Sequence, residues 1–504
     1  MEIGSLLSHH GRRRAAALAL VCGDLRLTYA AFDARVACVA GALGQLGLVR
    51  GDRLATLLGN CPELLEVFWA AARLGVVVVP ISPLLRPPAI ATLLHDCGAA
   101  LVITDAAHTA ALDAAFVIPE ASRHRQRVCI DGAPPGYADY HALVAAALPA
   151  QPVVLHGDDL YNIMYSSGTT GLPKGIAISH AARARYGALF AGIYRMTPES
   201  VVLHAGALVF NGAFLTLMPA LYLGCTYVLL RRFDAAELVA TARRERVTHI
   251  KLVPSQIVAL LEHPEFAAEH LPDLQMIGSV GAPLMLEHKQ ALERRLPGRL
   301  YELYGLTEGF MTILEPRDLA SKLSSVGAPP PFQQIRIVDE QRELVPPGTV
   351  GEIIGRSPLL MEGYYGRPDL TAAAVIDGWM YSGDLGYLDD DGFLYLVDRK
   401  KDLIISGGIN IYPRDIEEIL VQHPAVREAA VFGVPDAKWG ETPTAAVVLH
   451  PYASISAEDL RSWINARVAA GFQKLSMLHL LDDLPRNAAG KTLKRELRER
   501  FGGR

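Results

Sequence analysis

A run of hydroxyl, glycine and lysine residues in the first third of the chain has the composition of a phosphate-binding loop. Residues 165–175 read YSSGTTGLPKG, in which glycines permit tight turns while hydroxyls and N–H groups can surround phosphate oxygens. The GxxxxGK[ST] spacing of a Walker loop is absent, and a Ser/Gly-rich surface loop is the alternative for so short a string. Apolar residues on both sides predict a turn between two strands. The expected phosphate ligands are Ser166, Ser167, Gly168, Thr169, Thr170, Gly171 and Lys174.

Further short strings whose residues could bind a ligand or take part in a reaction follow in order along the chain. Each contains a turn-forming glycine or proline together with a side chain that suits nucleotide chemistry, such as an acceptor-only carboxylate for a vicinal diol or a lysine at a loop tip. Taken singly, each is more simply an ordinary turn, a buried tyrosine or a solvated lysine. The strings are GAPL at 281–284, YGLTE at 304–308, WMYSGD at 379–384, SGGINIYP at 406–413 and LPRNAAGK at 484–491.

Together and in this order, the strings resemble the acyl-adenylate-forming superfamily, which includes acyl-CoA synthetases, luciferases and peptide-synthetase adenylation domains. The resemblance runs from about Thr28 to Lys494. It implies that Lys491 bridges the attacking carboxylate and the α-phosphate, that Thr307 contacts the α-phosphate, and that Glu308 with Thr170 holds Mg²⁺. It also implies an adenine and ribose site built from Gly281, Ala282, Pro283, Tyr304, Gly305, Asp384 and Arg399.

The same resemblance extends to coenzyme A and to a domain hinge. Gly407 and Gly408 are expected to let the pantetheine arm pass close to backbone, with Trp439 in a neighbouring CoA-side segment. Lys401 falls where the family hinges, and we expect the small domain to reorient there between the two half-reactions. Ser382 and Ile409 are departures from the commoner residues of the family at their positions.

The acyl pocket is where the chain departs most from the family. Many relatives carry Pro-Leu-Phe-His where this chain reads Ala207–Gly212, and Phe210 stands at the histidine position, where it can block a passage but cannot titrate. His204 is expected to be a satisfied strand-end histidine. The pocket residues expected from their position are largely apolar and carry no dedicated charge, which favours a hydrophobic acid. They are Phe210, Asn211, Val253, Pro254 and Ser255.

The expected reaction joins a carboxylic acid to CoA at the expense of ATP, through an acyl-AMP intermediate, with release of AMP and pyrophosphate. A fatty acid is the favoured substrate, which would give the protein a role in fatty acid metabolism. The alternatives are an aryl-acid CoA ligase and a stand-alone adenylation enzyme that loads a carrier protein. The ligase-like Gly407-Gly408 and Trp439-Gly440-Glu441 strings argue against the carrier-protein reading.

Bulk composition excludes several other classes of protein. A length of 504 residues predicts more than one domain, and a net charge of −5 with no long basic run gives no sign of nucleic-acid binding. The six cysteines are widely spaced and form no metal-ligand pattern, so we expect reduced, buried thiols in a cytoplasmic protein and no zinc. Membrane contact is expected to be peripheral at most, and a homodimer stays open.

The elements that must position these residues alternate between strand and helix patterns, which predicts an α/β fold. We expect a large N-terminal domain (1–398) with mixed, largely parallel sheets, a hinge (399–402) and a small mobile α+β C-terminal domain (403–504). The uncharged run 207–230 is interpreted as a buried helix followed by a strand, and Asp391-Gly392 as a hairpin turn. Strands are expected at Arg53–Leu58, Gly75–Pro80, Ala100–Thr104, Val201–His204, Cys225–Leu230, His249–Val253 and Gln275–Val280.

Overall fold

A computed structural model describes residues 1–118, 126–151, 153–166, 174–407, 409–486 and 492–502. By its internal contacts the chain divides into two units that interleave in sequence. The first unit comprises Met1–Val280, Gly305–Phe310 and Ser357–Ala374, and the second comprises Gly281–Tyr304, Met311–Arg356 and Val375–Arg504. The predicted boundary at residues 399–402 stays a prediction.

The first unit contains an eight-stranded sheet in the order β18-β9-β8-β4-β3-β5-β6-β7. Strands β8, β4, β3, β5, β6 and β7 run parallel, whereas β9 and β18 are antiparallel to their neighbours. The central strands are buried apolar runs, as parallel strands covered on both faces require. The bounds are β3 Arg53–Leu57, β4 Val77–Pro80, β5 Leu101–Thr104, β6 Gln126–Cys129, β7 Ala138–Asp139, β8 Leu160–Ser166, β9 Lys174–Ser179 and β18 Gly363–Tyr364.

A second sheet of the same unit has the order β13-β12-β10-β11-β1-β2. Its strands are parallel where their pairing is described, except that β2 forms an antiparallel hairpin with β1 across the turn at Gly23. The bounds are β1 Leu18–Cys22, β2 Leu25–Thr28, β10 Val201–His204, β11 Thr226–Leu229, β12 His249–Leu252 and β13 Met276–Val280.

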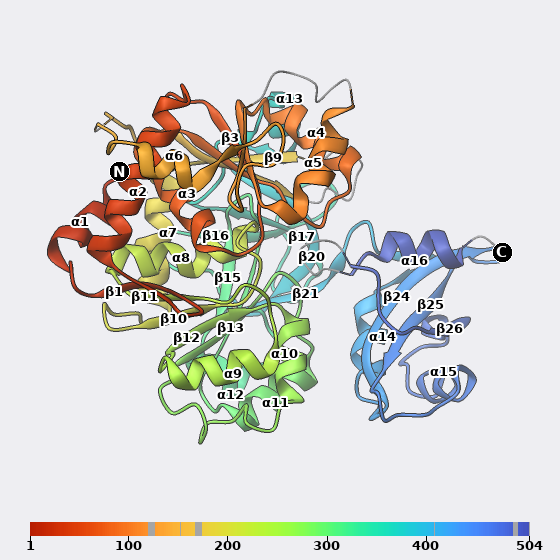
Figure 1. Cartoon of the computed structure of the whole chain (residues 1–504). Helices are drawn as coiled ribbons and strands as arrows, with labels where there is room; N and C mark the ends of the chain where they lie inside the picture. Colours follow the sequence, from red (N-terminus) through yellow and green to blue (C-terminus); the bar gives the residue numbers. More distant parts are fainter. Residues whose placement is uncertain (119–125, 152, 167–173, 408, 487–491, 503–504) are drawn as a thin grey trace. The chain divides into compact units, whose positions relative to one another are not determined.

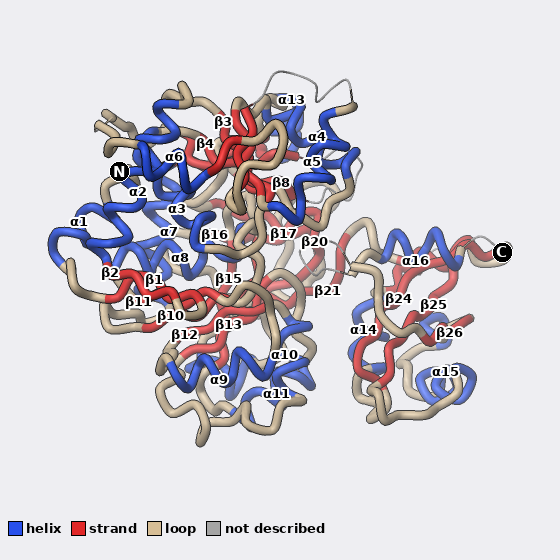
Figure 2. Tube along the Cα trace, viewed as in Figure 1, coloured by secondary structure: helices blue, strands red, loops and turns tan. Residues whose placement is uncertain are grey.

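Helices connect these strands and cover the sheets (Figures 1 and 2). In α2 the apolar residues at three- and four-residue spacing, Phe32 to Leu43, are buried, and the Thr28 side chain caps the helix by accepting from the N–H of Ala31. The bounds are α1 Leu6–Arg13, α2 Tyr29–Gln45, α3 Pro62–Leu74, α4 Pro87–Cys97, α5 Thr109–Phe116, α6 Tyr140–Ala146, α7 His180–Ile193, α8 Asn211–Leu223, α9 Ala235–Arg244, α10 Pro254–Leu261 and α13 Pro368–Ala374, with a 3₁₀ turn at Ala106–His108.

The second unit contains a five-stranded antiparallel sheet with the path β16-β17-β20-β19, and β21 pairs with β20. The β20–β21 hairpin turns at Asp391-Gly392, where Gly392 adopts a φ of +81°. The remaining elements of this part are β14 Leu300–Gly305, β15 Met311–Leu314, β16 Gln334–Val338, β17 Gly351–Arg356, β19 Val375–Ile376, β20 Trp379–Leu388, β21 Leu394–Arg399, α11 Leu286–Arg295, α12 Leu319–Lys322 and a 3₁₀ turn at Pro316–Asp318.

The last hundred residues of this unit form a sheet with an apolar cluster on each face. Alternate residues of β24 and β25 pack under α14 and α15 on one face and under α16 on the other. The sheet path is β23-β22-β25-β24 with β26 beside β25. The bounds are β22 Ile404–Ser406, β23 Ile409–Ile411, α14 Pro413–Leu420, β24 Val426–Asp436, β25 Gly440–Leu449, α15 Ala457–Asn465, β26 Met477–Leu480 and α16 Lys494–Phe501, with a 3₁₀ turn at Gly471–Gln473.

The expected elements are confirmed, with ends that differ by one or two residues. The uncharged run 207–230 is the buried helix α8, ended by Gly224 at a φ of +79°, followed by the parallel strand β11. None of the helices in the described ranges has the length and apolarity needed to cross a membrane. All six cysteines are free thiols, and five of them are buried.

One expectation about His204 is wrong. The residue ends strand β10 as predicted and is buried, but neither ring nitrogen has a hydrogen-bond partner of ordinary geometry among the described residues. Its ring instead stacks on Tyr227 with centroids 6.1 Å apart. Burial lowers the pKa of His204 to about 4, so the imidazole is neutral near pH 7.

Candidate active site

The predicted phosphate loop connects two antiparallel strands, as the sequence indicated. Ser166 on β8 lies opposite Lys174 on β9, and Tyr165 lies opposite Gly175. A Cβ on Gly175 would meet Cγ2 of Ile163 at 2.8 Å, so the strand pair closes over a position that only glycine fills without displacement. The expected ligands Ser167, Gly168, Thr169, Thr170 and Gly171 lie outside the described residues, as does the side chain of Ser166.

Tyr364 joins the end of this loop to the predicted metal ligand Glu308. The short strand β18 pairs with β9 so that Tyr364 lies opposite Ile176. The Nζ atom of Lys174 lies 4.9 Å from the centroid of the Tyr364 ring, a cation–π distance. The Tyr364 hydroxyl donates to Oε1 of Glu308 at 2.9 Å. Burial and this carboxylate raise the pKa of Tyr364, so the phenol keeps its proton and remains a donor.

Asp384 stands at the centre of a second cluster, formed by β14, β20 and β21. Its Oδ2 accepts a hydrogen bond of 3.0 Å from the Tyr304 hydroxyl, and its Oδ1 lies 3.2 Å from Nε of Arg399. Asp384 is 8% exposed, and the Ser382 hydroxyl accepts from its backbone N–H at 3.0 Å. Burial and the carboxylate raise the pKa of Tyr304. Both carboxylate oxygens are therefore held by donors and keep further lone pairs for a ligand.

The loop after β13 takes the conformation that its glycine permits. Gly281 has a φ of +94° and is exposed, as is Pro283, whereas Ala282 is half-buried. The N–H of Leu284 donates to Oε1 of Glu302 at 3.1 Å, and this buried carboxylate also pairs with Lys289. The predicted adenine-flanking loop is thus anchored at its far end.

The predicted acyl-pocket residues follow the carboxyl ends of two neighbouring parallel strands. Phe210 and Asn211 come after β10, and Val253–Ser255 after β12. All five are half-buried. Carboxyl ends of parallel strands are where α/β sheets bind ligands, which agrees with the predicted position.

The structure adds a cation to this region that the sequence did not indicate. Nη1 of Arg183 in α7 donates to Oδ1 of Asn211 at 2.8 Å. No local pattern marks this arginine, because an isolated arginine on a helix usually reads as a solvated surface residue.

The two predicted CoA-side strings contact each other. Gly407 has a φ of +58°, and its N–H donates to the carbonyl oxygen of Trp439 at 2.7 Å. A Cβ at Gly407 would meet the indole at 2.9 Å. Trp439 is 49% exposed, and Nζ of Lys438 lies 4.4 Å from the centroid of its ring. The indole is therefore a surface group and does not belong to the core. Gly408 lies outside the described residues.

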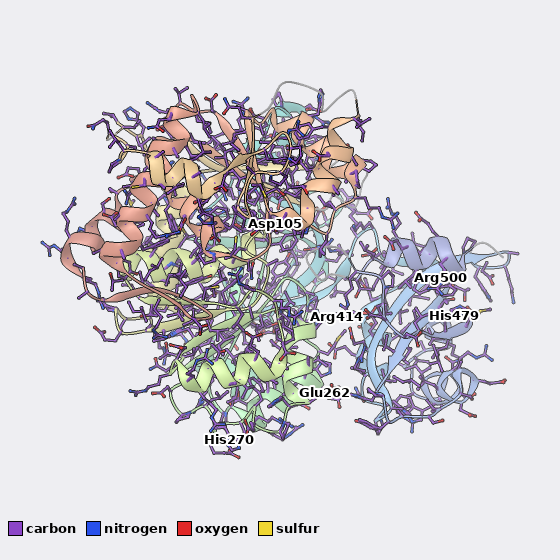
Figure 3. The ribbon with its side chains drawn as sticks, viewed as in Figure 1. Asp105, Glu262, His270, Arg414, His479 and Arg500 are labelled. Atoms are coloured by element: carbon purple, nitrogen blue, oxygen red, sulfur yellow. The ribbon has the colours of Figure 1, made fainter. Side chains whose placement is uncertain are left out.

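An arginine from α16 of the same unit bonds to the turn that is predicted as a hinge, and a second arginine bonds to the strand before it. Lys401 is exposed, and its carbonyl oxygen accepts from Nη1 of Arg498 in α16 at 3.2 Å. Nη2 of the same arginine donates to the Asp402 carbonyl oxygen at 3.2 Å. Arg414, labelled in Figure 3, donates from Nη1 to the Leu396 carbonyl oxygen at 3.2 Å.

Other predicted residues are only partly placed. Thr307 and Gly305 belong to the same short stretch as Glu308, with Thr307 half-buried and Gly305 exposed. Lys491, the predicted adenylation lysine, lies outside the described residues. Within the described ranges no group of three or more metal-ligating side chains gathers.

Comparison with known proteins identifies the family. The AMP-binding enzyme family matches residues 7–365, and its C-terminal domain matches residues 415–491. The chain is 35% identical to a feruloyl-CoA synthase of an Amycolatopsis species, over 99% of both chains. It is 33% identical to a long-chain-fatty-acid–CoA ligase of Mycobacterium tuberculosis, over 95% of this chain and 94% of that one.

A solved structure agrees with these sequence matches. ATP-bound MatB from Rhodopseudomonas palustris superposes with a TM-score of 0.89 at 28% identity, over 100% of this chain and 99% of that one. The predicted α/β class is confirmed, with a large N-terminal domain of mixed, mostly parallel sheets and a small C-terminal domain. The chain therefore belongs to the AMP-binding enzyme family and is an AMP-forming acid–CoA ligase.

Proposed function

We propose that this chain activates a hydrophobic carboxylic acid as its acyl-adenylate and then transfers the acyl group to CoA. The observation that carries the proposal is the Asp384 cluster. A buried carboxylate whose two oxygens are oriented by Tyr304 and Arg399 is suited to accept hydrogen bonds from the two hydroxyls of a ribose. The family resemblance assigns Gly281, Ala282, Pro283 and Gly305 to the adenosine site as well, and MatB, a relative of high structural similarity, was solved with ATP bound.

The phosphate side of the site is assigned to the Lys174–Tyr364–Glu308 chain. Lys174 carries the positive charge at the end of the phosphate loop, and Thr307 is assigned to the α-phosphate. The Tyr364 hydroxyl donates a hydrogen bond to one carboxylate oxygen of Glu308, and the other oxygen remains available to a cation. A hard carboxylate oxygen fits Mg²⁺, which takes one or two carboxylates together with substrate phosphates. When bound there, Mg²⁺ would neutralise phosphate charge.

The first half-reaction needs no protein nucleophile. A carboxylate oxygen of the acid attacks the α-phosphorus of ATP, the bond to the bridging oxygen of pyrophosphate breaks, and acyl-AMP forms. The assigned role of Lys491 is to bridge the attacking carboxylate and the α-phosphate, where it would stabilise the charge that shifts between them.

In the second half-reaction the CoA thiol attacks the acyl carbonyl, AMP leaves and a thioester remains. Gly407 and Trp439 form the proposed pantetheine path, because the missing side chain at Gly407 leaves backbone accessible beside an exposed indole. The proposed reorientation about Lys401 takes place between the two half-reactions. Lys401→Pro should spare pyrophosphate release and impair thioester formation; equal loss of both activities would contradict the hinge.

A hydrophobic acyl group is supported by the pocket residues and by the relatives. Phe210, Val253 and Pro254 are apolar and half-buried. The matched proteins include both an aryl-acid and a fatty-acid ligase, so both substrate classes belong to the proposal. Loading of a carrier protein is the less supported alternative, because the contact between Gly407 and Trp439 joins the two ligase-like strings.

Acid-dependent ATP–pyrophosphate exchange, followed by thioester formation with and without CoA, tests the proposal. The acid panel should contain octanoate, palmitate, cinnamate, ferulate and succinate. We expect exchange with a subset of the hydrophobic acids and thioester only when CoA is present. Exchange with succinate alone would refute the hydrophobic assignment, and transfer to a carrier protein but not to CoA would refute the ligase assignment for the second half.

A further inference from the structure

Arg183 is a fully buried cation with no carboxylate partner in the described part of the chain. Its exposed fraction is 0%, and no carboxylate of the described residues lies within ion-pair distance. Two other cations with little exposed surface differ in this respect: the buried Lys289 pairs with Glu302, and the half-buried Lys494 lies 2.8 Å from Glu417. Burial lowers the pKa of Arg183 to about 10, so the guanidinium stays charged near neutral pH.

Neutral groups from three elements surround this charge. Nε and Nη2 each donate to Oδ1 of Asn162 in β8 at 3.3 Å, and Nη1 donates to Oδ1 of Asn211 at 2.8 Å. The guanidinium carbon lies 4.0 Å from the Phe214 ring centroid and 5.0 Å from that of Tyr186. Apolar side chains in place of buried charges are often as stable or more stable, so stability alone gives little reason for an arginine here. Its forked geometry, which reaches two elements at once, is the property that an apolar residue lacks.

The two elements that Arg183 connects are those that lead to the two halves of the proposed site. Strand β8, which carries Asn162, runs directly into the phosphate loop. Asn211 is the first residue of α8, and the residue before it is Phe210, which by the family resemblance stands at the position of a histidine in many relatives. Arg183 therefore fixes the start of α8 relative to the strand that presents the phosphate loop.

A second buried anchor holds the other end of the same segment. We define residues 205–211, between β10 and α8, as the entrance segment. Asn60, itself 8% exposed, accepts from the N–H of Leu208 at 2.9 Å and donates to the carbonyl oxygens of Gly206 at 2.6 Å and Leu230 at 3.0 Å. The entrance segment is thus held by side-chain hydrogen bonds from α7 at its C-terminal end and from the residues before α3 at its N-terminal end.

We propose that Arg183 and Asn60 are positioning residues that fix the entrance segment, and with it Phe210, so that this segment sets which acyl groups are admitted. The inference rests on the proposed function for the location of the acyl pocket. Neither residue is assigned a contact with ATP or with the reacting atoms. Phe210 has no titratable group and makes no capping hydrogen bond from its side chain, so its position depends on the backbone that these two anchors hold.

Steady-state adenylation kinetics of Arg183→Met and Asn60→Ala test the role. Methionine keeps much of the arginine stem volume and removes the fork. Each variant should raise the KM for the acid about tenfold, which corresponds to the loss of one hydrogen bond of about 1.4 kcal/mol. The KM for ATP should change less than about twofold. Global destabilisation would instead lower the active fraction, and hence kcat, and it would not raise the KM for the acid more than the KM for ATP.

The double variant and a matched control sharpen the result. Because both anchors hold one segment, the double variant should raise the acid KM by much less than the product of the single effects. Arg185, two residues further along α7, is exposed and donates to the Pro358 carbonyl oxygen at 2.9 Å. Arg185→Met should leave the acid KM unchanged. If Arg183→Met does not fold, Arg183→Lys keeps the charge without the fork and should show the same split to a smaller degree.

Hydrogen–deuterium exchange of the free protein separates this inference from the proposed function, because it needs no substrate. Peptides that cover residues 205–211 should exchange faster in Arg183→Met and Asn60→Ala, while peptides from the end of α7 should not change. Unchanged exchange and unchanged acid KM would overturn the inference even if the wild type is an active ligase. A KM effect confined to acids with a second anionic group would also overturn it, since Arg183 would then contact substrate directly.

Discussion

Removal of the Tyr364 hydroxyl tests the link between the phosphate loop and Glu308. Tyr364→Phe deletes the donor that lies 2.9 Å from Oε1 of Glu308 and keeps the ring that faces Lys174 Nζ at 4.9 Å. A hydrogen bond to a charged acceptor contributes about 1.5–3 kcal/mol, and the half-buried setting favours the lower end of this range. If Glu308 is positioned by this bond, kcat/KM for adenylation should fall about tenfold, since about 1.4 kcal/mol corresponds to one factor of ten.

Pyrophosphate release measured across a Mg²⁺ titration is the informative assay. With its carboxylate no longer oriented, the variant should need more Mg²⁺ for half-maximal rate, and the melting temperature should change little because no large cavity forms. Tyr365→Phe, at the adjacent residue, is the control. An unchanged Mg²⁺ requirement and an unchanged kcat/KM in Tyr364→Phe would refute the idea that this phenol positions Glu308.

The remaining predictions address other parts of the chain. Lys491→Ala should abolish acyl-AMP formation yet still convert supplied acyl-AMP to thioester; loss of both activities would mean that the lysine is misassigned. Gly407→Ala places a Cβ 2.9 Å from the Trp439 indole at a φ of +58°, so thioester formation should fall while pyrophosphate release persists, at a stability cost of about 1–3 kcal/mol in a thermal melt. Since burial lowers the pKa of His204 to about 4 from an unfolded value of about 6.5, the unfolded chain binds the extra proton between these pH values. The free energy of unfolding therefore falls as pH drops from 6.5 to 4, by about 3 kcal/mol from this group, and His204→Phe should flatten that slope in urea titrations at pH 7 and pH 4.5.

The β20–β21 hairpin shows what local sequence patterns can predict about this fold and what they cannot. Asp391-Gly392 correctly predicted the turn, and the strands pair as Leu388 with Leu394 and Tyr387 with Tyr395. If that register continued along the hairpin, Arg399 would lie opposite Gly383. An irregularity between Leu385 and Gly386 shifts the pairing by one residue, and Arg399 lies opposite Asp384 instead. A shift of one residue turns side chains to the other face, and no local pattern in the chain announces a bulge.

Contacts between distant segments were the other missed feature. Tyr364 and Arg183 each complete their roles through partners in other elements, Glu308 and Asn211, at sequence separations of 56 and 28 residues. Periodicity identifies which face of a helix is buried, yet it cannot indicate that a buried arginine will meet an asparagine from another helix. Helix and strand assignments depend on local pattern and were therefore recovered well, whereas these pairings depend on packing.

Helix α16 carries no proposed catalytic group, but its Arg498 holds the carbonyl oxygens of Lys401 and Asp402. A mechanical load on this helix is therefore transmitted to the turn about which the C-terminal domain is proposed to swing. An affinity tag or a reporter protein fused behind α16 would act on that turn through two hydrogen bonds.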